Sequence, residues 1–481
     1  MFKKYLRLII LSWLVLFSFT LFAHDSKANE TPTVSPILPG ASLPFKIEID
    51  LFSQSLPQGF HSGAGATWED KWLFIAGRTN GMHGFNDDNQ NFPIQQQNIN
   101  VIVIDIKSGF ASSKSLYNPD ACLSQIEVDS LSVTSPQSYQ RGDTLYMTGG
   151  YGVNTLTGEF STKDVLSVIH IPGLIHWVLN PSSDESAKEH IRQISDPIFK
   201  ITGGTMHELE DNTTLLVFGQ NFQGFYNPGS DGDYSKQVRR FKIIDKGFEL
   251  SIKTLRPKPK YKEENYRRRD LNIVPAICCE HGEPVPYLVA LSGVFTLTGG
   301  AWTIPVIIDR SGKPSTFSSL DTATFKQGMN NYASATVGLF SAATQDMFTT
   351  LFGGISFGYF NGTTFITDPQ LPFINQVTTI ARNADGDFAQ YLMAASFPTI
   401  LSTTINPGNT LLFGAGAEFF LDLSIKHYSN GVIDFDALPD HPLTIGYIVG
   451  GIESTLPNTN TKADSSASDK IFRVRLTKNF S

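Results

Sequence analysis

A short hydrophobic segment that ends in one or two glycines recurs along the whole chain, and this repeat constrains the fold more than any other feature. A second, β-branched segment follows most of these repeats after a loop, at 99–106, 165–171, 238–244, 304–308 and 471–476. A hairpin that leads into glycine, followed by a loop and another strand, predicts a small antiparallel sheet repeated along the chain. The glycine-ended segments are 72–77, 145–150, 215–219, 288–293, 348–354, 411–414 and 445–451.

A single sheet of this kind cannot bury both of its faces, whereas several sheets around an axis can. The repeat therefore predicts an all-β fold, a single closed β-propeller of four-stranded blades. Because of these glycine-ended strands, residues 45–478 resemble the kelch and galactose-oxidase-like β-propeller superfamily. They look closest to its uncharacterised secreted bacterial members. The Tyr and Trp residues that mark regular kelch repeats are mostly missing here, so the resemblance concerns the fold more than the function.

The spacing of the glycines predicts six blades with an insertion at about 404–440, and seven blades with two short ones are the alternative. The first five glycine anchors lie roughly 60–75 residues apart, longer than a kelch unit of about 50, whereas the last two are closer. Pairing segment 45–52 with segment 471–476 in one blade would close the ring and remove an exposed edge. Residues 24–44 are expected to form a flexible leader, and 456–469 a mobile polar loop.

Composition and charge narrow the class of protein. With 41% hydrophobic and 17% charged residues, the chain is expected to fold rather than to be disordered. It carries 37 basic and 45 acidic residues, a formal charge of −8, which argues against nucleic acid as a partner. Residues 1–23 are typical of a secretory signal, with Lys3, Lys4 and Arg7 before an apolar run. We expect cleavage and a periplasmic or secreted protein without a membrane span; an uncleaved anchor is the alternative.

The three cysteines are too few for a disulfide scaffold. A bridge from Cys278 or Cys279 to Cys122, a strained vicinal disulfide and free buried thiols all remain open. Cys278 and Cys279 precede Glu280 and His281, but ligands so close together rarely converge on one ion. We therefore expect no metal and no cofactor.

The candidate binding face follows from blade topology. In a four-stranded blade, the connection from the second to the third strand and the connection into the next blade emerge on the same rim. Here these connections are long and rich in polar and aromatic residues, which is typical of binding loops on a rigid scaffold. The candidate ligand-binding residues are Arg78, Asn80, His83, Gln220, Tyr226, Arg268, Arg269, Asp270, Asn331, Tyr332 and Tyr359.

Several charged residues on this rim have two interpretations. At least one arginine of 267–269 could hold an anion or a carboxylate, with Asp270 orienting a guanidinium; the alternative is an ion pair with neighbouring glutamates. His61 is expected to be a satisfied core histidine. His83 and Glu453 are the candidates for a catalytic acid or base, and Glu418 in the predicted insertion is a further acid considered for that role.

We expect a non-catalytic binding propeller that recognises a protein, a glycan or a surface component, and whether it catalyses a reaction stays open. The resemblance also implies an alternative, a carbohydrate-active enzyme similar to sialic-acid mutarotases or epimerases. In that enzyme Arg268 or Arg269 would clamp a carboxylate, and His83 or Glu453 would act as acid or base. A copper radical oxidase needs a Tyr cross-linked to a Cys and two His ligands near the axis. It is rejected because Cys122 falls between blades, Cys278 and Cys279 fall within a strand, and the ten histidines show no matching pair. The sequence does not indicate an oligomeric state.

Overall fold

The computed structural model describes residues 34–479 except 88, 183, 228 and 460–462, so the predicted signal at 1–23 lies outside the described residues. The described part contains five four-stranded sheets, one six-stranded sheet and four two-stranded sheets. The larger sheets follow one another in chain order and are numbered here from first to sixth.

The bounds of the strands in the six larger sheets are as follows. The first sheet contains β3 (Ala64–Trp68), β4 (Lys71–Ile75), β5 (Asn100–Asp105) and β6 (Ala111–Ser115), and the second β7 (Gln137–Arg141), β8 (Thr144–Thr148), β11 (Val165–His170) and β12 (Ile191–Ser195). The third contains β13 (Thr205–Glu208), β14 (Thr214–Val217), β17 (Val238–Asp245) and β18 (Leu250–Lys258), and the fourth β19 (Asn272–Glu280), β20 (Glu283–Leu291), β21 (Val306–Ile308) and β22 (Pro314–Thr316). The fifth contains β23 (Ala335–Phe340), β24 (Met347–Ile355), β27 (Phe373–Arg382), β28 (Phe388–Ser396), β1 (Ile37–Pro39) and β30 (Ile433–Asp434), and the sixth β29 (Ala417–Leu421), β31 (Leu443–Gly450), β34 (Lys470–Lys478) and β2 (Phe45–Ser55).

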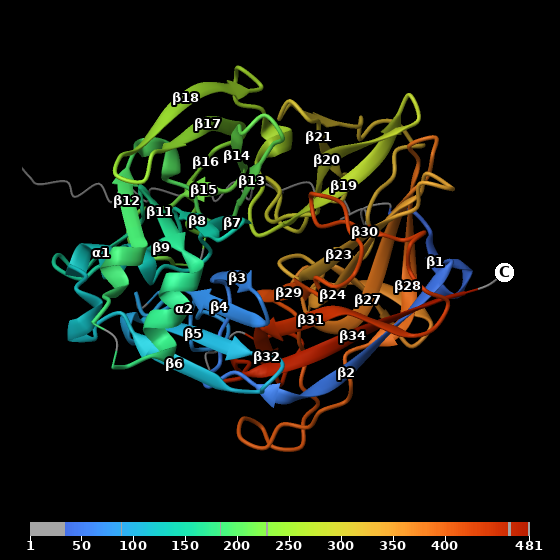
Figure 1. Cartoon of the computed structure of the whole chain (residues 1–481). Helices are drawn as coiled ribbons and strands as arrows, with labels where there is room; N and C mark the ends of the chain where they lie inside the picture. The colour runs from blue at the N-terminus through green and yellow to red at the C-terminus, as the bar shows by residue number, and fades with distance from the viewer. Residues whose placement is uncertain (1–33, 88, 183, 228, 460–462, 480–481) are drawn as a thin grey trace, which may run out of the picture. The chain divides into compact units, whose positions relative to one another are not determined.

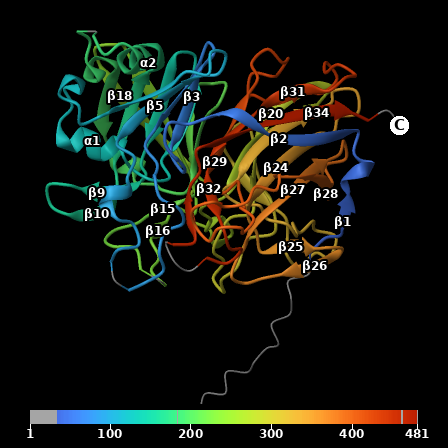
Figure 2. The same ribbon diagram turned by 90° about the horizontal axis from the view of Figure 1, so that it is seen from below.

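Four short hairpins and two helices lie in the connections. The hairpins are β9 (Tyr151–Asn154) with β10 (Glu159–Thr162), β15 (Gln220–Asn221) with β16 (Asp233–Tyr234), β25 (Gly358–Asn361) with β26 (Thr364–Thr367), and β32 (Ile452–Ser454) with β33 (Ser465–Ala467). The helices are α1 (Gln125–Leu131) and α2 (Ile171–Leu179). Figure 2 shows the hairpins β9–β10, β15–β16 and β25–β26 on one side of the sheets, away from α2.

The sheets have the arrangement of a β-propeller, following one another around a common centre in Figure 1. Each sheet shares a cluster of buried hydrophobic side chains with the next, and the sixth sheet shares one with the first. In the last of these clusters Phe420 and Val449 of the sixth sheet pack with Trp72 and Phe74 of the first. The Trp72 and Phe420 rings stack with centroids 4.9 Å apart. Burial between neighbouring sheets is thus the main apolar contribution to stability.

The prediction of six four-stranded blades, with seven as the alternative, is wrong, because only five sheets of the described residues are four-stranded blades. Five sheets have four strands, whereas the fifth sheet has six because two short strands extend it on both edges. On one edge β1 pairs in parallel with β28, from Ile37 opposite Gln390 to Pro39 opposite Leu392. This strand falls in the segment 24–44 that was expected to be a flexible leader. On the other edge β30 pairs in parallel with β23.

The segment 404–440 does not behave as one inserted loop. It supplies β30 to the fifth sheet, and it also contains β29, which is an edge strand of the sixth sheet. The expected mobile loop at 456–469 likewise contains β33, which pairs with β32. The expectations of an insertion at 404–440 and of a loop at 456–469 thus both missed short strands.

The first long strand of the described chain pairs with its last strand, as the sequence predicted. β2 lies antiparallel to β34, with Phe45 opposite Lys478 and Leu51 opposite Phe472. Alternate residues of β2 (Phe45, Ile47 and Ile49) are buried, while the residues between them face outward. The pairing thus places both ends of the propeller in the sixth sheet.

Six of the seven glycine-ended segments are second strands of a sheet, and one is not. The chain at 411–414 forms no strand; Leu411 and Phe413 are buried, and Gly414 packs against the backbone of Phe352. Among the true strand ends, Gly150 has φ +79°, and an added Cβ would lie 2.5 Å from Val133 Cγ2. Glycine is required there both by the backbone conformation and by the close approach of Val133, which precedes the first strand of the same sheet.

Two further expectations concern the cysteines and the membrane. Cys122, Cys278 and Cys279 are free, but they are not the fully buried thiols that the third alternative described: Cys122 is exposed, and Cys278 and Cys279 are partly buried. Among the described residues, none of the helices has the length and hydropathy to span a bilayer.

Candidate functional site

Each sheet directs two residues toward the centre from the same structural position. One residue lies just before the first strand of the sheet, and the other lies just after its second strand. A backbone bridge joins the two in five sheets, and in the sixth the Ile452 N–H donates to the Ala415 carbonyl at 2.7 Å. The six pairs are His61 with Arg78, Thr134 with Tyr151, Thr202 with Gln220, Arg269 with Val294, Tyr332 with Ile355, and Ala415 with Ile452.

All twelve of these residues line one cavity of about 380 Å³. Its walls come from the connections after the second strands and the connections before the first strands, which is the rim chosen in the sequence analysis. A volume of this size accommodates a small organic ligand.

The residues that follow the first member of each pair form a ring beneath the cavity. Ser62, Ser135, Gly203, Asp270, Ala333 and Gly416 all have positive φ, between 48° and 68°. The Ser135 N–H donates to the Ser62 carbonyl (2.8 Å), the Asp270 N–H to the Gly203 carbonyl (2.8 Å), and the Ser62 N–H to the Gly416 carbonyl (3.0 Å). Such strained backbone persists only where its surroundings hold it, and here the hydrogen bonds between sheets do so.

Arg78 brings a buried positive charge to the cavity. Its side chain is 2% exposed; Nε donates to Asn80 Oδ1 (3.0 Å), and Nη2 donates to the Pro93 carbonyl (2.9 Å). The guanidinium lies 5.1 Å from the centre of the Phe92 ring. No carboxylate of the described residues forms an ion pair with it, and Nη1 has no hydrogen-bond partner among them. Burial lowers the pKa of Arg78 to about 10, so the group is still charged at neutral pH.

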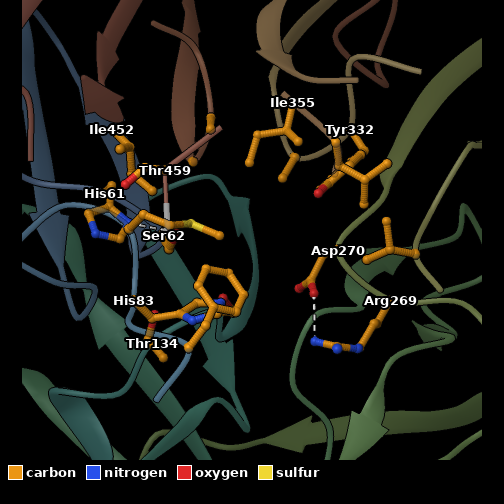
Figure 3. Close-up of a pocket in the computed structure, with 18 of the residues that line it drawn as sticks. His61, Ser62, His83, Thr134, Arg269, Asp270, Tyr332, Ile355, Ile452 and Thr459 are labelled. Atoms are coloured by element: carbon orange, nitrogen blue, oxygen red, sulfur yellow. Dashed lines mark hydrogen bonds and ion pairs between the residues drawn. The ribbon is translucent and has the colours of Figure 1, made fainter. Parts of the chain in front are cut away.

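Two uncharged histidines, His61 and His83, lie on one side of the cavity in Figure 3, and a backbone bridge joins His61 to Arg78. Burial and, to a smaller extent, the Arg78 charge lower the pKa of His61 to about 3. Burial likewise lowers the pKa of His83 to about 4. The His83 ring stacks on Phe92 with centroids 4.9 Å apart, and its Nδ1 lies 2.8 Å from the Gly84 carbonyl oxygen. Both imidazoles are therefore neutral at pH 7.

The opposite side of the cavity holds a charge pair and a tyrosine (Figure 3). Arg269 Nη1 donates to Asp270 Oδ2 at 2.9 Å, and its Nε donates to the Tyr234 hydroxyl at 2.9 Å. Burial opposes the charge of Arg269, but Asp270 and nearby tyrosines outweigh burial and raise the pKa of Arg269. Tyr332 is 7% exposed, and burial raises the pKa of its hydroxyl, which therefore remains protonated. The charges of Arg269 and Asp270 cancel, so the charge of Arg78 makes the cavity positively charged overall.

Aromatic and aliphatic side chains line much of the rest of the cavity. One wall is aromatic, with Phe92, Tyr151, Phe222 and Tyr226 in a single cluster. The other is mainly aliphatic and consists of Val294, Ile355, Leu371, Phe373 and Ile452. The cavity is therefore amphipathic rather than uniformly polar.

Seven of the eleven residues chosen from the sequence as ligand-binding candidates line this cavity. They are Arg78, His83, Gln220, Tyr226, Arg269, Asp270 and Tyr332. Asn80 does not line it but accepts the hydrogen bond from Arg78 Nε, and so it orients that guanidinium.

Arg268, unlike Arg269, lies away from the cavity. It is 1% exposed, its Nε and Nη1 donate to the carbonyls of Asn265 and Ser292, and it lies 4.6 Å from the Trp302 ring centre. Burial lowers its pKa to about 9. It therefore holds together the connections into and within the fourth sheet instead of facing a ligand.

Asn331, Tyr359 and Glu453 also lie outside the cavity lining. Asn331 Nδ2 donates to the Gly353 and Gln376 carbonyls, a structural role. Tyr359 belongs to the β25–β26 hairpin, where it pairs with Ile366. Glu453 accepts hydrogen bonds from Lys470 Nζ (2.6 Å) and Ser466 Oγ (3.2 Å), so its carboxylate is already occupied.

Glu418 faces a second cavity of about 260 Å³ on the other side of the ring. The two cavities share five ring residues: Ser62, Ser135, Asp270, Ala333 and Gly416. Burial raises the pKa of Glu418 to about 7. Its carboxyl group has no hydrogen-bond or ion-pair partner among the described residues.

The sequence reasoning missed some lining residues. His61 was expected to be a core histidine; it is 5% exposed, but its buried side chain lines the cavity. Thr134 and Thr202 were not singled out, although they occupy the position equivalent to His61 in the next two sheets. Superposing the six repeats on the residue before each first strand would have found all three.

Comparisons with known proteins add little to this description. No protein-family model matches the chain, and no curated protein matches it. Among solved structures, the one titled "Structure of YjhT" is similar, with a TM-score of 0.45 and 11% sequence identity over 88% of this chain and 99% of that chain. The assignment of a propeller arrangement therefore rests on the sheets and their packing.

Proposed function

We propose that the chain is a closed, kelch-like β-propeller that acts as a non-catalytic binding module and takes an anionic ligand into its central cavity. The observation that carries this proposal is Arg78, a buried cation that lines the cavity without an ion-pair partner among the described residues. Burying a charge is costly unless another charge or several hydrogen bonds compensate it. A carboxylate on a protein, glycan or surface component would supply the missing partner.

The alternative, a carbohydrate-active enzyme, has weaker support. An acid or base works best when its pKa lies near the operating pH. His83, with a pKa of about 4, is far from that range, and Glu453 is paired with Lys470 outside the cavity. Of the two arginines considered for clamping a carboxylate, Arg268 lies away from the cavity. The other, Arg269, already donates a hydrogen bond to Asp270.

Isothermal titration of the purified protein with benzoate and with benzamide tests the proposal. A charged carboxylate on Arg78 should bind about tenfold or more tightly than its neutral amide. Arg78→Gln should remove that preference, whereas Arg310→Gln, a control at an exposed arginine, should keep it. Equal binding of both probes, or an unchanged preference in Arg78→Gln, would contradict the proposal.

We also propose that residues 1–23 are a cleaved export signal and that the protein works in the periplasm or outside the cell. The basic start and the apolar run support this proposal. Amino-terminal sequencing of the protein from the soluble exported fraction should begin after residue 23; an intact Met1 would contradict it.

A further inference from the structure

The central cavity has two polar ends of different chemistry. Arg78 Nη1 is the free donor at one end, beside the neutral His61 and His83. At the other end the Tyr332 hydroxyl and Asp270 Oδ1 have no hydrogen-bond partner among the described residues, and Figure 3 shows both side chains directed toward the open space. A ligand that spans the cavity would thus contact the Arg78 cation at one end. At its other end it would contact the neutral Tyr332 hydroxyl beside the Arg269–Asp270 ion pair, whose charges cancel.

The walls between these ends offer few free hydrogen-bonding groups. The Tyr151 hydroxyl donates to the Gly224 carbonyl at 2.8 Å, and Gln220 Oε1 accepts from the Gly232 N–H at 2.9 Å. Thr202 Oγ1 donates to the Ser135 carbonyl at 3.2 Å. Most of the remaining lining is aromatic or aliphatic, including Phe92 and Ile355, and the side chains of Thr134 and Gln370 add polar groups to it. A sugar ring placed here would give up hydrogen bonds to water and find few replacements, which is unfavourable.

We infer that the ligand is an organic carboxylate with a flat aromatic or otherwise apolar body and a hydrogen-bonding group at its far end. This inference rests on the proposed function and narrows its ligand class. The carboxylate would pair with Arg78 Nη1, and the body would lie between the Phe92 and Ile355 walls. The far hydroxyl would meet Tyr332 and Asp270. Acidic sugars have the carboxylate but lack the flat aromatic or apolar body.

Titration calorimetry with a graded set of probes tests the ligand class. The set contains 4-hydroxybenzoate, 4-hydroxyphenylacetate and 3-(4-hydroxyphenyl)propionate, so that one length can match the span of the cavity. Each probe is paired with its analogue lacking the hydroxyl, and glucuronate is the acidic sugar. We expect the best aryl carboxylate to bind at least about tenfold more tightly than glucuronate.

Matched variants locate the two ends of the ligand. Tyr332→Phe should reduce the advantage of the hydroxylated probe over its analogue by about threefold to tenfold, as loss of one hydrogen bond predicts. Tyr359→Phe removes the same atom outside the cavity and should change nothing. Circular dichroism spectra that match the wild type would show that both variants are folded.

The possible failures are distinguishable. If glucuronate binds as tightly as the best aryl carboxylate, the inferred ligand class is wrong while the proposed anion site stands. If Tyr332→Phe and Tyr359→Phe have the same effect on binding, the inferred contact between the far hydroxyl of the ligand and Tyr332 is wrong. If no carboxylate binds at all, both the inference and the proposed function fail.

Discussion

Replacement of Glu418 by Gln should change how the stability of the protein depends on pH. The carboxyl group is half-buried at the second cavity, has no partner among the described residues, and its pKa rises from 4.5 to about 7 because of burial. A carboxyl group with a raised pKa in the folded state contributes fully to stability below its unfolded pKa. That contribution is lost as the pH rises toward the folded pKa, because the folded state then has to ionise a poorly solvated group.

The magnitude follows from the size of the shift. At about 1.4 kcal/mol per pKa unit, the wild type should lose up to about 3 kcal/mol of unfolding free energy between pH 4.5 and pH 7.5, relative to Glu418→Gln. Glutamine mimics the protonated carboxyl group and does not titrate, so the variant should lack this slope.

Urea unfolding of both proteins at half-unit pH steps measures the difference directly. The wild type should approach the variant in stability near pH 4.5 and fall below it at pH 7.5. A difference that stays constant across this range would contradict the prediction, because it would mean that Glu418 is solvated in the folded protein.

Three further predictions concern packing, charge and the cavity. Gly150→Val should lower stability by about 2 kcal/mol or more, since it combines a positive φ with a contact on Val133, and a melting curve checks this. Carboxylate affinity measured by calorimetry should stay constant from pH 5.5 to 8.5, because His61 and His83 titrate near pH 3 and 4; a step near pH 6.5 would be inconsistent with neutral imidazoles. Arg268→Ala should lower the melting temperature by leaving two carbonyls without donors, yet keep carboxylate affinity in the folded fraction; a lost affinity would place Arg268 at the ligand.

The repeat of glycine-ended strands was enough to predict the propeller arrangement, because each such strand is a second strand whose end must leave its sheet. The same sequence pattern led to a wrong prediction of a strand at 411–414, where Leu411 and Phe413 are buried in the core without a partner strand. Local sequence does not distinguish a second strand from a buried turn, because apolar residues followed by a glycine are compatible with both. The strand β1 was missed because its partner, β28, lies more than 300 residues away in sequence.

The location of the candidate site could be predicted, but not the direction of individual side chains. Arg267, Arg268 and Arg269 are consecutive, and only the third lines the cavity. Arg267 ion-pairs with Asp231, and Arg268 is buried against Trp302. Neighbouring residues of an extended chain point to different sides. Their register is set by the bridge from Arg269 to Val294, which the sequence does not reveal.

A crystal structure of the protein with the tightest-binding aryl carboxylate tests the proposed binding site directly. We predict one carboxylate oxygen about 2.8 Å from Arg78 Nη1, with the ring between the aromatic and aliphatic walls. A ligand bound elsewhere on the surface, or lying in the cavity with its carboxylate away from Arg78, would contradict it.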